Sequence, residues 1–67
     1  MTKQEMINRL KDRIAYSQEE QGRYEELHGE HIRDGGDTHS IWSEMADWYK
    51  GRICAFNLAI EMAEELS

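Results

Sequence analysis

Arg52 is the residue whose chemistry and position most need an explanation, because it lies near the middle of an otherwise apolar helical face. An unpaired charge in such a place would be costly. When the chain is folded back on itself at its central glycines, Arg52 comes opposite Gln21 and Ser17. Tyr24 and Tyr49 then lie beside them. A guanidinium fork flanked by neutral hydrogen-bonding groups and rings is suited to binding a carboxylate or phosphate.

Three interpretations of Arg52 stay open at this point. In the first, it belongs to a polar layer that fixes the register of the helices and of a dimer. Alternatively, it extends past the apolar face to Glu20 or Asp47. The third interpretation is a pocket between protomers that binds a small anion or nucleotide and so makes the protein an oligomeric sponge for that ligand.

The histidines raise the question of a metal site. Glu25-x-x-His28 has the i, i+3 spacing of di-iron helical bundles, and His31 and His39 follow it. Such sites also need glutamates that point inward from neighbouring helices, whereas the glutamates of the second half fall on its polar side. We therefore predict no metal site and no cofactor, and interpret the histidines as partly exposed residues close to the turn.

No catalytic residue is predicted. Cys54 lies on the polar side of its helix, without a basic residue placed to activate the thiol. A single cysteine forms no internal disulfide, which fits a reducing compartment. Residues 1–5 are polar, unlike a signal peptide, and no apolar run is long enough to span a bilayer. We expect a cytoplasmic protein without membrane association.

Two helices must position these residues. Thr2 and Glu5 form a capping-box pattern that predicts a helix over about 3–33. Asp34-Gly35-Gly36-Asp37 predicts a turn over about 34–38, and Thr38 or Ser40 caps a second helix over about 40–66. Proline is absent. The prediction is an all-α antiparallel helical hairpin in one domain, with facing residues whose numbers add up to about 73.

The second helix is expected to contact more than the first. Its apolar side chains cover roughly 200° of its circumference, about twice what one partner helix covers. Trp48 points away from Trp42, so both cannot face the first helix. The hydrophobic core that a chain of 67 residues can form is also only marginally stable by itself. We expect a homodimer that forms a four-helix bundle. The predicted dimer or partner contacts are Trp42, Met45, Trp48, Ile53, Phe56, Ala59, Ile60 and Ala63.

The charge pattern bears on the class of partner. Of the net charge of −6, residues 34–67 contribute −5, because Lys50 and Arg52 are the only cations there against seven acidic residues. An acidic chain repels phosphate backbones on average, so RNA or anionic membranes are less favoured than protein. We expect a non-enzymatic binding or regulatory protein that occupies a protein partner through its acidic surface and turn-end aromatics.

Two resemblances bear on this expectation. Residues 1–5, followed by Arg13, Ser17 and Gln18, resemble the start of the ROP family of plasmid copy-number regulators, whose two-helix chains pair into a four-helix bundle that binds RNA. Asp12 and Glu19 stand at positions that are core in that family. The whole chain is also similar in style to short acidic helical accessory proteins of phages and plasmids. That likeness implies an inhibitor of a host defence or replication factor.

The ROP resemblance implies RNA binding as a further alternative. The corresponding exposed face is formed by Lys3, Lys11, Arg13, Gln18 and Arg23. Acidic residues at 12, 19 and 20 interrupt this face.

Overall fold

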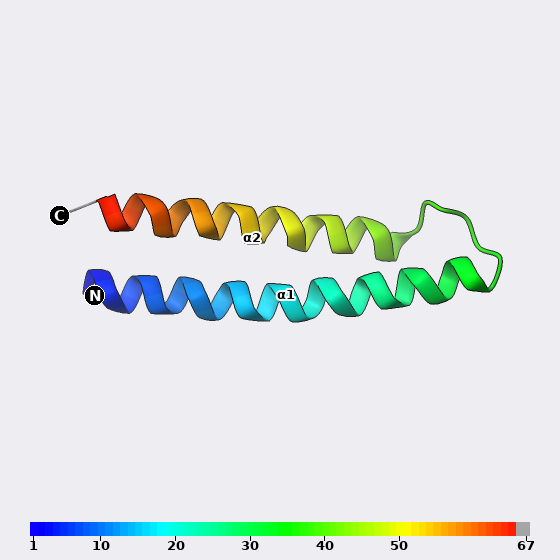
Figure 1. Ribbon diagram of the computed structural model, residues 1–67, viewed down its shortest axis with the longest axis horizontal. Helices are drawn as coiled ribbons and strands as arrows, with labels where there is room; N and C mark the ends of the chain where they lie inside the picture. The colour runs from blue at the N-terminus through cyan, green and yellow to red at the C-terminus, as the bar shows by residue number, and fades with distance from the viewer. Residues whose placement is uncertain (66–67) are drawn as a thin grey trace.

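The computed structural model describes residues 1–65, which form two long helices lying antiparallel and side by side (Figure 1). Helix α1 spans Lys3–Arg33 and helix α2 spans Ile41–Glu65. The molecule measures 53 × 14 × 12 Å, so it is one layer of two helices. The all-α helical hairpin is therefore confirmed. Leu66, which the sequence pattern places at the end of the second helix, lies outside the described residues.

Both helices begin at a hydroxyl side chain that caps the first turn. Thr2 Oγ1 accepts a hydrogen bond from the Glu5 N–H at 3.1 Å, as the capping-box pattern predicts. Of the two candidates for the second helix, Ser40 is the cap. Its Oγ accepts the Ser43 N–H at 3.3 Å, and the Ser43 Oγ accepts the Ser40 N–H at 3.3 Å. This reciprocal pair satisfies two backbone donors that the helix leaves free.

Helix α1 ends in a Schellman motif at the predicted turn. Gly35 has φ +88° and its N–H donates to the Ile32 carbonyl at 3.0 Å. The Gly36 N–H donates to the His31 carbonyl at 2.9 Å. This pattern requires a positive φ at the residue after the cap, which glycine adopts without a steric penalty. A Cβ at Gly36 would overlap the imidazole ring of His31, so a larger residue there would displace that ring.

The two helices meet along one seam in which residues alternate at spacings of three and four. Every residue of the seam is buried or half-buried. The seam comprises Ile7, Leu10, Ile14, Ser17, Gln21, Tyr24, His28 and His31 of α1 and Trp42, Ala46, Tyr49, Ile53, Phe56, Ile60 and Ala63 of α2. This spacing is typical of helices that pack as in a left-handed coiled coil.

Contacts along the hairpin confirm the predicted register. The rings of Tyr24 and Tyr49 stack with their centroids 5.9 Å apart, and those of His31 and Trp42 lie 5.4 Å apart. Both pairs add up to 73, as predicted. At the open end, the Lys3 Nζ donates to the main-chain carbonyl of Glu64 at 3.3 Å. The expected approach of Lys3 to the acidic end of the second helix is therefore also confirmed.

The core between the helices is thin. Among residues 1–65, Ile7, Ala46 and Ala63 are the only apolar side chains that are almost completely buried, and the polar Ser17 is buried with them. Two of these apolar residues are alanines, which bury little area, so this single layer has a small hydrophobic stabilisation. Within the same part of the chain, neither helix contains a segment long and apolar enough to cross a membrane.

Candidate functional site: the outer face of α2

A row of apolar residues on α2 is left uncovered by α1. Ile41, Trp48, Leu58 and Met62 keep 65, 52, 55 and 65% of their surface exposed. Gly51 and Ala55 are exposed and complete a spacing of three, four or seven from Ile41 to Met62. We call these six residues the outer row. At 100° per residue the outer row lies about 145° around α2 from the seam, so it faces away from α1.

The middle of the outer row is formed by its two smallest residues. Gly51 has no atom within 4 Å of where a Cβ would stand. The sequence suggests close helix packing along the four-residue repeat of Gly51, Ala55, Ala59 and Ala63. The structure divides this repeat: Ala63 is buried and Ala59 half-buried, whereas Gly51 and Ala55 are exposed. A step of four residues turns about 40° around a helix, which carries the repeat from one side of α2 to the other.

Arg52 stands between the seam and the outer row. Its guanidinium carbon lies 4.7 Å from the ring centroid of Trp48 and 5.3 Å from that of Phe56. Its Nε is buried and donates to no acceptor among residues 1–65. No ion pair joins it to Glu20 or Asp47 in this part of the chain. Cation–π contacts on its own helix therefore hold the Arg52 side chain in place.

The other polar residues predicted to surround Arg52 have different neighbours. Gln21 Nε2 donates to the Glu25 carboxylate at 3.0 Å. Ser17 is buried in the seam with 1% of its surface exposed. Within residues 1–65 no hydrogen bond joins Arg52 to either side chain. The same residues enclose no pocket; the predicted ligand pocket was one between protomers.

The predicted tyrosines do come together. Tyr24 and Tyr49 stack with 14° between their ring planes, and Trp48 meets Tyr49 edge-on at 4.9 Å. Desolvation raises the pKa of the Tyr49 phenol, and the nearby Tyr16 hydroxyl and Glu20 carboxylate raise this pKa further. The cluster therefore favours the neutral phenol and links the seam to the outer row through Trp48.

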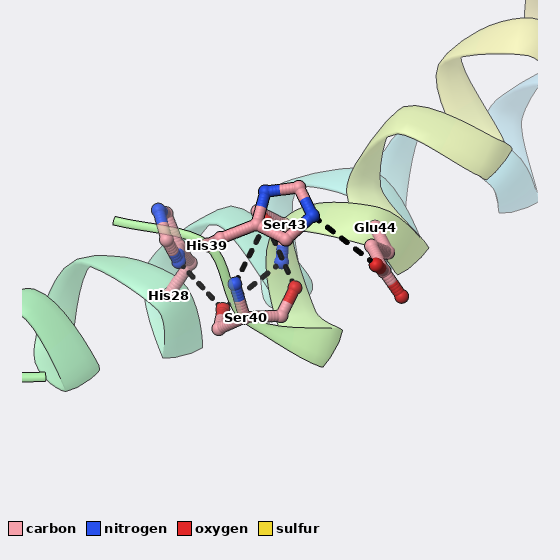
Figure 2. Close-up of polar contacts among 5 residues, drawn as sticks. All are labelled: His28, His39, Ser40, Ser43 and Glu44. Atoms are coloured by element: carbon pink, nitrogen blue, oxygen red, sulfur yellow. Dashed lines mark hydrogen bonds and ion pairs between the residues drawn. The ribbon is translucent and has the colours of Figure 1, made fainter. Parts of the chain in front are cut away.

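The turn end is held by a polar network (Figure 2). His28 Nδ1 lies 2.7 Å from the Ser40 Oγ, and the Ser43 Oγ donates to the Ser40 carbonyl at 2.8 Å. His39 is turned toward Glu44, with its Nε2 3.4 Å from the carboxylate (Figure 2). His28 and His39 thus have different polar partners, Ser40 and Glu44. Within residues 1–65 no three His, Cys, Asp or Glu side chains gather as metal ligands.

The residues predicted as dimer or partner contacts fall on both sides of α2. The seam contains Trp42, Ile53, Phe56, Ile60 and Ala63, while Met45 and Ala59 are half-buried at its edge and Trp48 belongs to the outer row. The helical wheel predicts that Trp42 and Trp48 cannot both face α1, and in the structure Trp42 is the one that does. Sequence reasoning did not assign Ile41, Leu58 and Met62 to a contact surface. The seven-residue spacing of 41, 48, 55 and 62 is the signal that identifies them.

Comparisons with known proteins identify no relative in which this surface could be examined. No family model, curated protein or solved structure matches the chain. The ROP resemblance therefore stays a prediction from a few N-terminal residues, and the outer row is the feature of the structure that bears on function.

Proposed function

We propose that this chain is a small non-enzymatic binding protein that self-associates through the outer row and occupies a protein partner. The observation that supports this most strongly is the exposure of four large apolar side chains in register on one side of α2. Contiguous apolar patches on soluble proteins mark interaction surfaces, and Trp is enriched among the residues that dominate binding energy.

Self-association follows from the thin core. A second hairpin on the outer row would place the two α2 helices side by side between the two α1 helices. Each of the four large side chains of the outer row is already one third to one half covered, so burying the rest contributes about 1 kcal/mol. Two copies supply eight such side chains, on the order of 8 kcal/mol before the cost of association. The low end of the cost of association, about 4 kcal/mol, leaves about 4 kcal/mol, which corresponds to dimers at about millimolar concentration.

The partner that we propose is a protein with a basic surface. Exposed carboxylates surround the turn at Glu30, Asp34, Asp37 and Glu44. Complementary charge speeds association and selects among partners more than it raises affinity. By analogy of style with short phage and plasmid proteins, we propose that the partner is a host factor whose activity is blocked when its surface is occupied.

Self-association is tested by sedimentation equilibrium on three proteins. Wild type is expected to dimerise, and Leu58→Ser/Met62→Ser to remain helical but become monomeric, because both side chains are more than half exposed in the hairpin. Ile32→Ser is the control, since Ile32 is exposed on α1 away from the outer row. A monomeric wild type, or equal association of all three proteins, would contradict the proposal.

Partner binding is tested by pull-down from host extract with wild type and with Asp34→Asn/Asp37→Asn, which keeps the outer row. We expect wild type to retain a stoichiometric protein that high salt or the double substitution releases. Absence of any such protein, or retention that is independent of these charges, would count against the proposed partner.

One observation favours a second candidate, the small-anion sponge. Arg52 presents a guanidinium whose Nε is buried and finds no acceptor among residues 1–65. An anion held between protomers would supply one. Native mass spectrometry of protein purified gently from its host would then show a stoichiometric anion, and Arg52→Met would keep the dimer while losing the anion. A dimer without bound anion would favour the protein-binding function.

A further inference from the structure

We propose that two copies of this chain pair α2 against α2 in a parallel arrangement, with both turns at the same end, and that Asp47 of each copy pairs with Arg52 of the other. This inference rests on the self-association proposed above and adds the orientation of the protomers and the charged pair that selects it.

The outer row fits a second copy of itself better than it fits α1 of another hairpin. The large exposed apolar side chains in the helical part of α1 are Met6, Tyr16 and Ile32, which are ten and sixteen residues apart and form no continuous row. In contrast, the outer row repeats at the three-four spacing of a coiled-coil seam. A surface that pairs with its own copy forms a closed two-fold dimer. The small residues Gly51 and Ala55 at the middle of the row allow the two helices to approach closely.

Charged residues of opposite sign flank the outer row at its middle. At 100° per residue, Arg52 lies about 70° to one side of the row and Asp47 about 70° to the other. The Asp47 flank also carries Cys54 and Glu61, one and two heptads further along. These flanks correspond to the e and g positions that set partner choice and orientation in coiled coils.

The two orientations place these charges differently. In a parallel pair, the flank of one helix faces the opposite flank of the other, so Asp47 faces the partner's Arg52, five residues further along. In an antiparallel pair, like flanks meet. The two Arg52 side chains would then face each other near the two-fold axis, and Asp47 would face the partner's Glu61. Opposite charges favour the parallel pair, and like charges disfavour the antiparallel one.

The position of the Arg52 side chain agrees with this pairing. Its guanidinium lies over Trp48, a member of the outer row, and so stands at the edge of the proposed contact. Its Nε is buried and donates to no acceptor within residues 1–65. A carboxylate from the partner's Asp47 would pair a charge that is otherwise held against aromatic rings.

Disulfide trapping distinguishes the orientations. In Cys54→Ser/Met62→Cys, a parallel dimer brings the two introduced thiols side by side, within the reach of a disulfide. In an antiparallel dimer centred on the outer row, position 62 faces residue 44, and the two thiols are about 27 Å apart along the axis. Met62 is 65% exposed, so the substitution leaves the hairpin intact. We expect this variant to form a disulfide-linked dimer under mild oxidation.

Disulfide formation through Cys54 in the wild-type protein reports the antiparallel arrangement instead. The Cys54 thiol is exposed and can therefore react. The two Cys54 thiols lie on opposite sides of a parallel contact but face each other in an antiparallel one. Linkage through position 62 together with slow linkage of wild type supports the proposal. Rapid linkage through Cys54, without linkage through position 62, would overturn it.

A charge substitution gives an independent measurement. Asp47→Lys places a cation against the partner's Arg52 in the parallel dimer, and should weaken dimerisation about tenfold relative to Glu19→Lys. The control makes the same change of charge at an exposed position of α1. In an antiparallel dimer the new lysine would face the partner's Glu61 and strengthen association, which would refute the inference. A wild type that is monomeric at every concentration would refute the proposed self-association too, whereas an antiparallel dimer would refute only the orientation.

Discussion

Replacing Gly22 with alanine should stabilise the hairpin, whereas replacing Gly36 should destabilise it. Gly22 is exposed inside α1, and a Cβ there would meet no atom within 4 Å. The added methyl group therefore only restores helix propensity, a gain of about 1 kcal/mol. At Gly36 the new Cβ would overlap the His31 ring, which packs on Trp42. Displacing that ring should cost about 1–3 kcal/mol.

Urea unfolding followed by circular dichroism measures both effects, at one fixed protein concentration because the proposed self-association would add to apparent stability. The expected gain at Gly22 corresponds to a rise in Tm of about 4–8 °C for a domain of this size. Ala15→Gly, at an exposed position of the same helix, is the matched control and should lose about 1 kcal/mol. A Gly22→Ala protein no more stable than wild type, or a Gly36→Ala protein stabilised to the same degree, would refute this reasoning.

Three further changes test the cap, the seam and the tyrosine cluster by the same method. Ser40→Ala should lower the free energy of unfolding by about 1 kcal/mol, since the Ser40 hydroxyl accepts a hydrogen bond from the Ser43 N–H. The control Thr38→Ala, in the exposed turn, should change the free energy of unfolding by less than about 0.5 kcal/mol. Equal losses would contradict the assignment of Ser40 as the cap. Ile7→Ala should cost about 2–4 kcal/mol because Ile7 is buried in the seam, and a loss below about 1 kcal/mol would show that this end of the core is not packed. The pKa of Tyr49 is raised in the folded state, so its contribution to stability is present below the ordinary value of 10.0 and is lost as the pH rises through the folded pKa. Tyr49→Phe should therefore lose less stability than wild type above pH 10.0, and an identical pH dependence would contradict this origin of the effect.

The fold could be predicted from the sequence because the residues that mark the helix ends act through contacts with near neighbours in the chain. Thr2 and the paired glycines mark the ends of α1 through hydrogen bonds between near neighbours. With both ends of the turn set, the length of the connection determines which residues face each other. The contacts of Tyr24 with Tyr49 accordingly occur in the predicted register.

The surroundings of Arg52 could not be derived from register alone. A facing position fixes where a Cα lies, but a long side chain follows the nearest favourable surface. For Arg52 that surface is on its own helix, because Trp48 and Phe56 are four residues before and after it. Residues four apart lie on the same face of a helix, so the Trp-x-x-x-Arg-x-x-x-Phe spacing predicts the observed cation–π pair. This spacing predicts the contacts of the Arg52 side chain better than the position of Arg52 opposite Gln21 and Ser17 does.

The sequence also did not show how the apolar residues of α2 divide between the seam and the outer row. The width of the face predicts a second contact surface on α2, but not which half meets α1. Five of the eight predicted contacts proved to be seam residues. The outer row repeats at the same three-four spacing as the seam, so spacing alone does not identify the half that meets α1. The structure identifies it through Tyr49 and Trp42, whose rings lie against those of Tyr24 and His31.

The asymmetry between the helices determines which measurement separates folding from association. Helix α1 has one continuous row of contact residues, whereas α2 has the seam and the outer row. A substitution in the seam, such as Ile7→Ala, must lower stability at every protein concentration. If the proposed self-association holds, a substitution in the outer row, such as Leu58→Ser, removes only the stabilisation that comes from binding a second copy, so its effect should vanish on dilution. If both substitutions destabilise the protein equally at all concentrations, the outer row is part of the folding core and the argument for a contact surface on α2 fails.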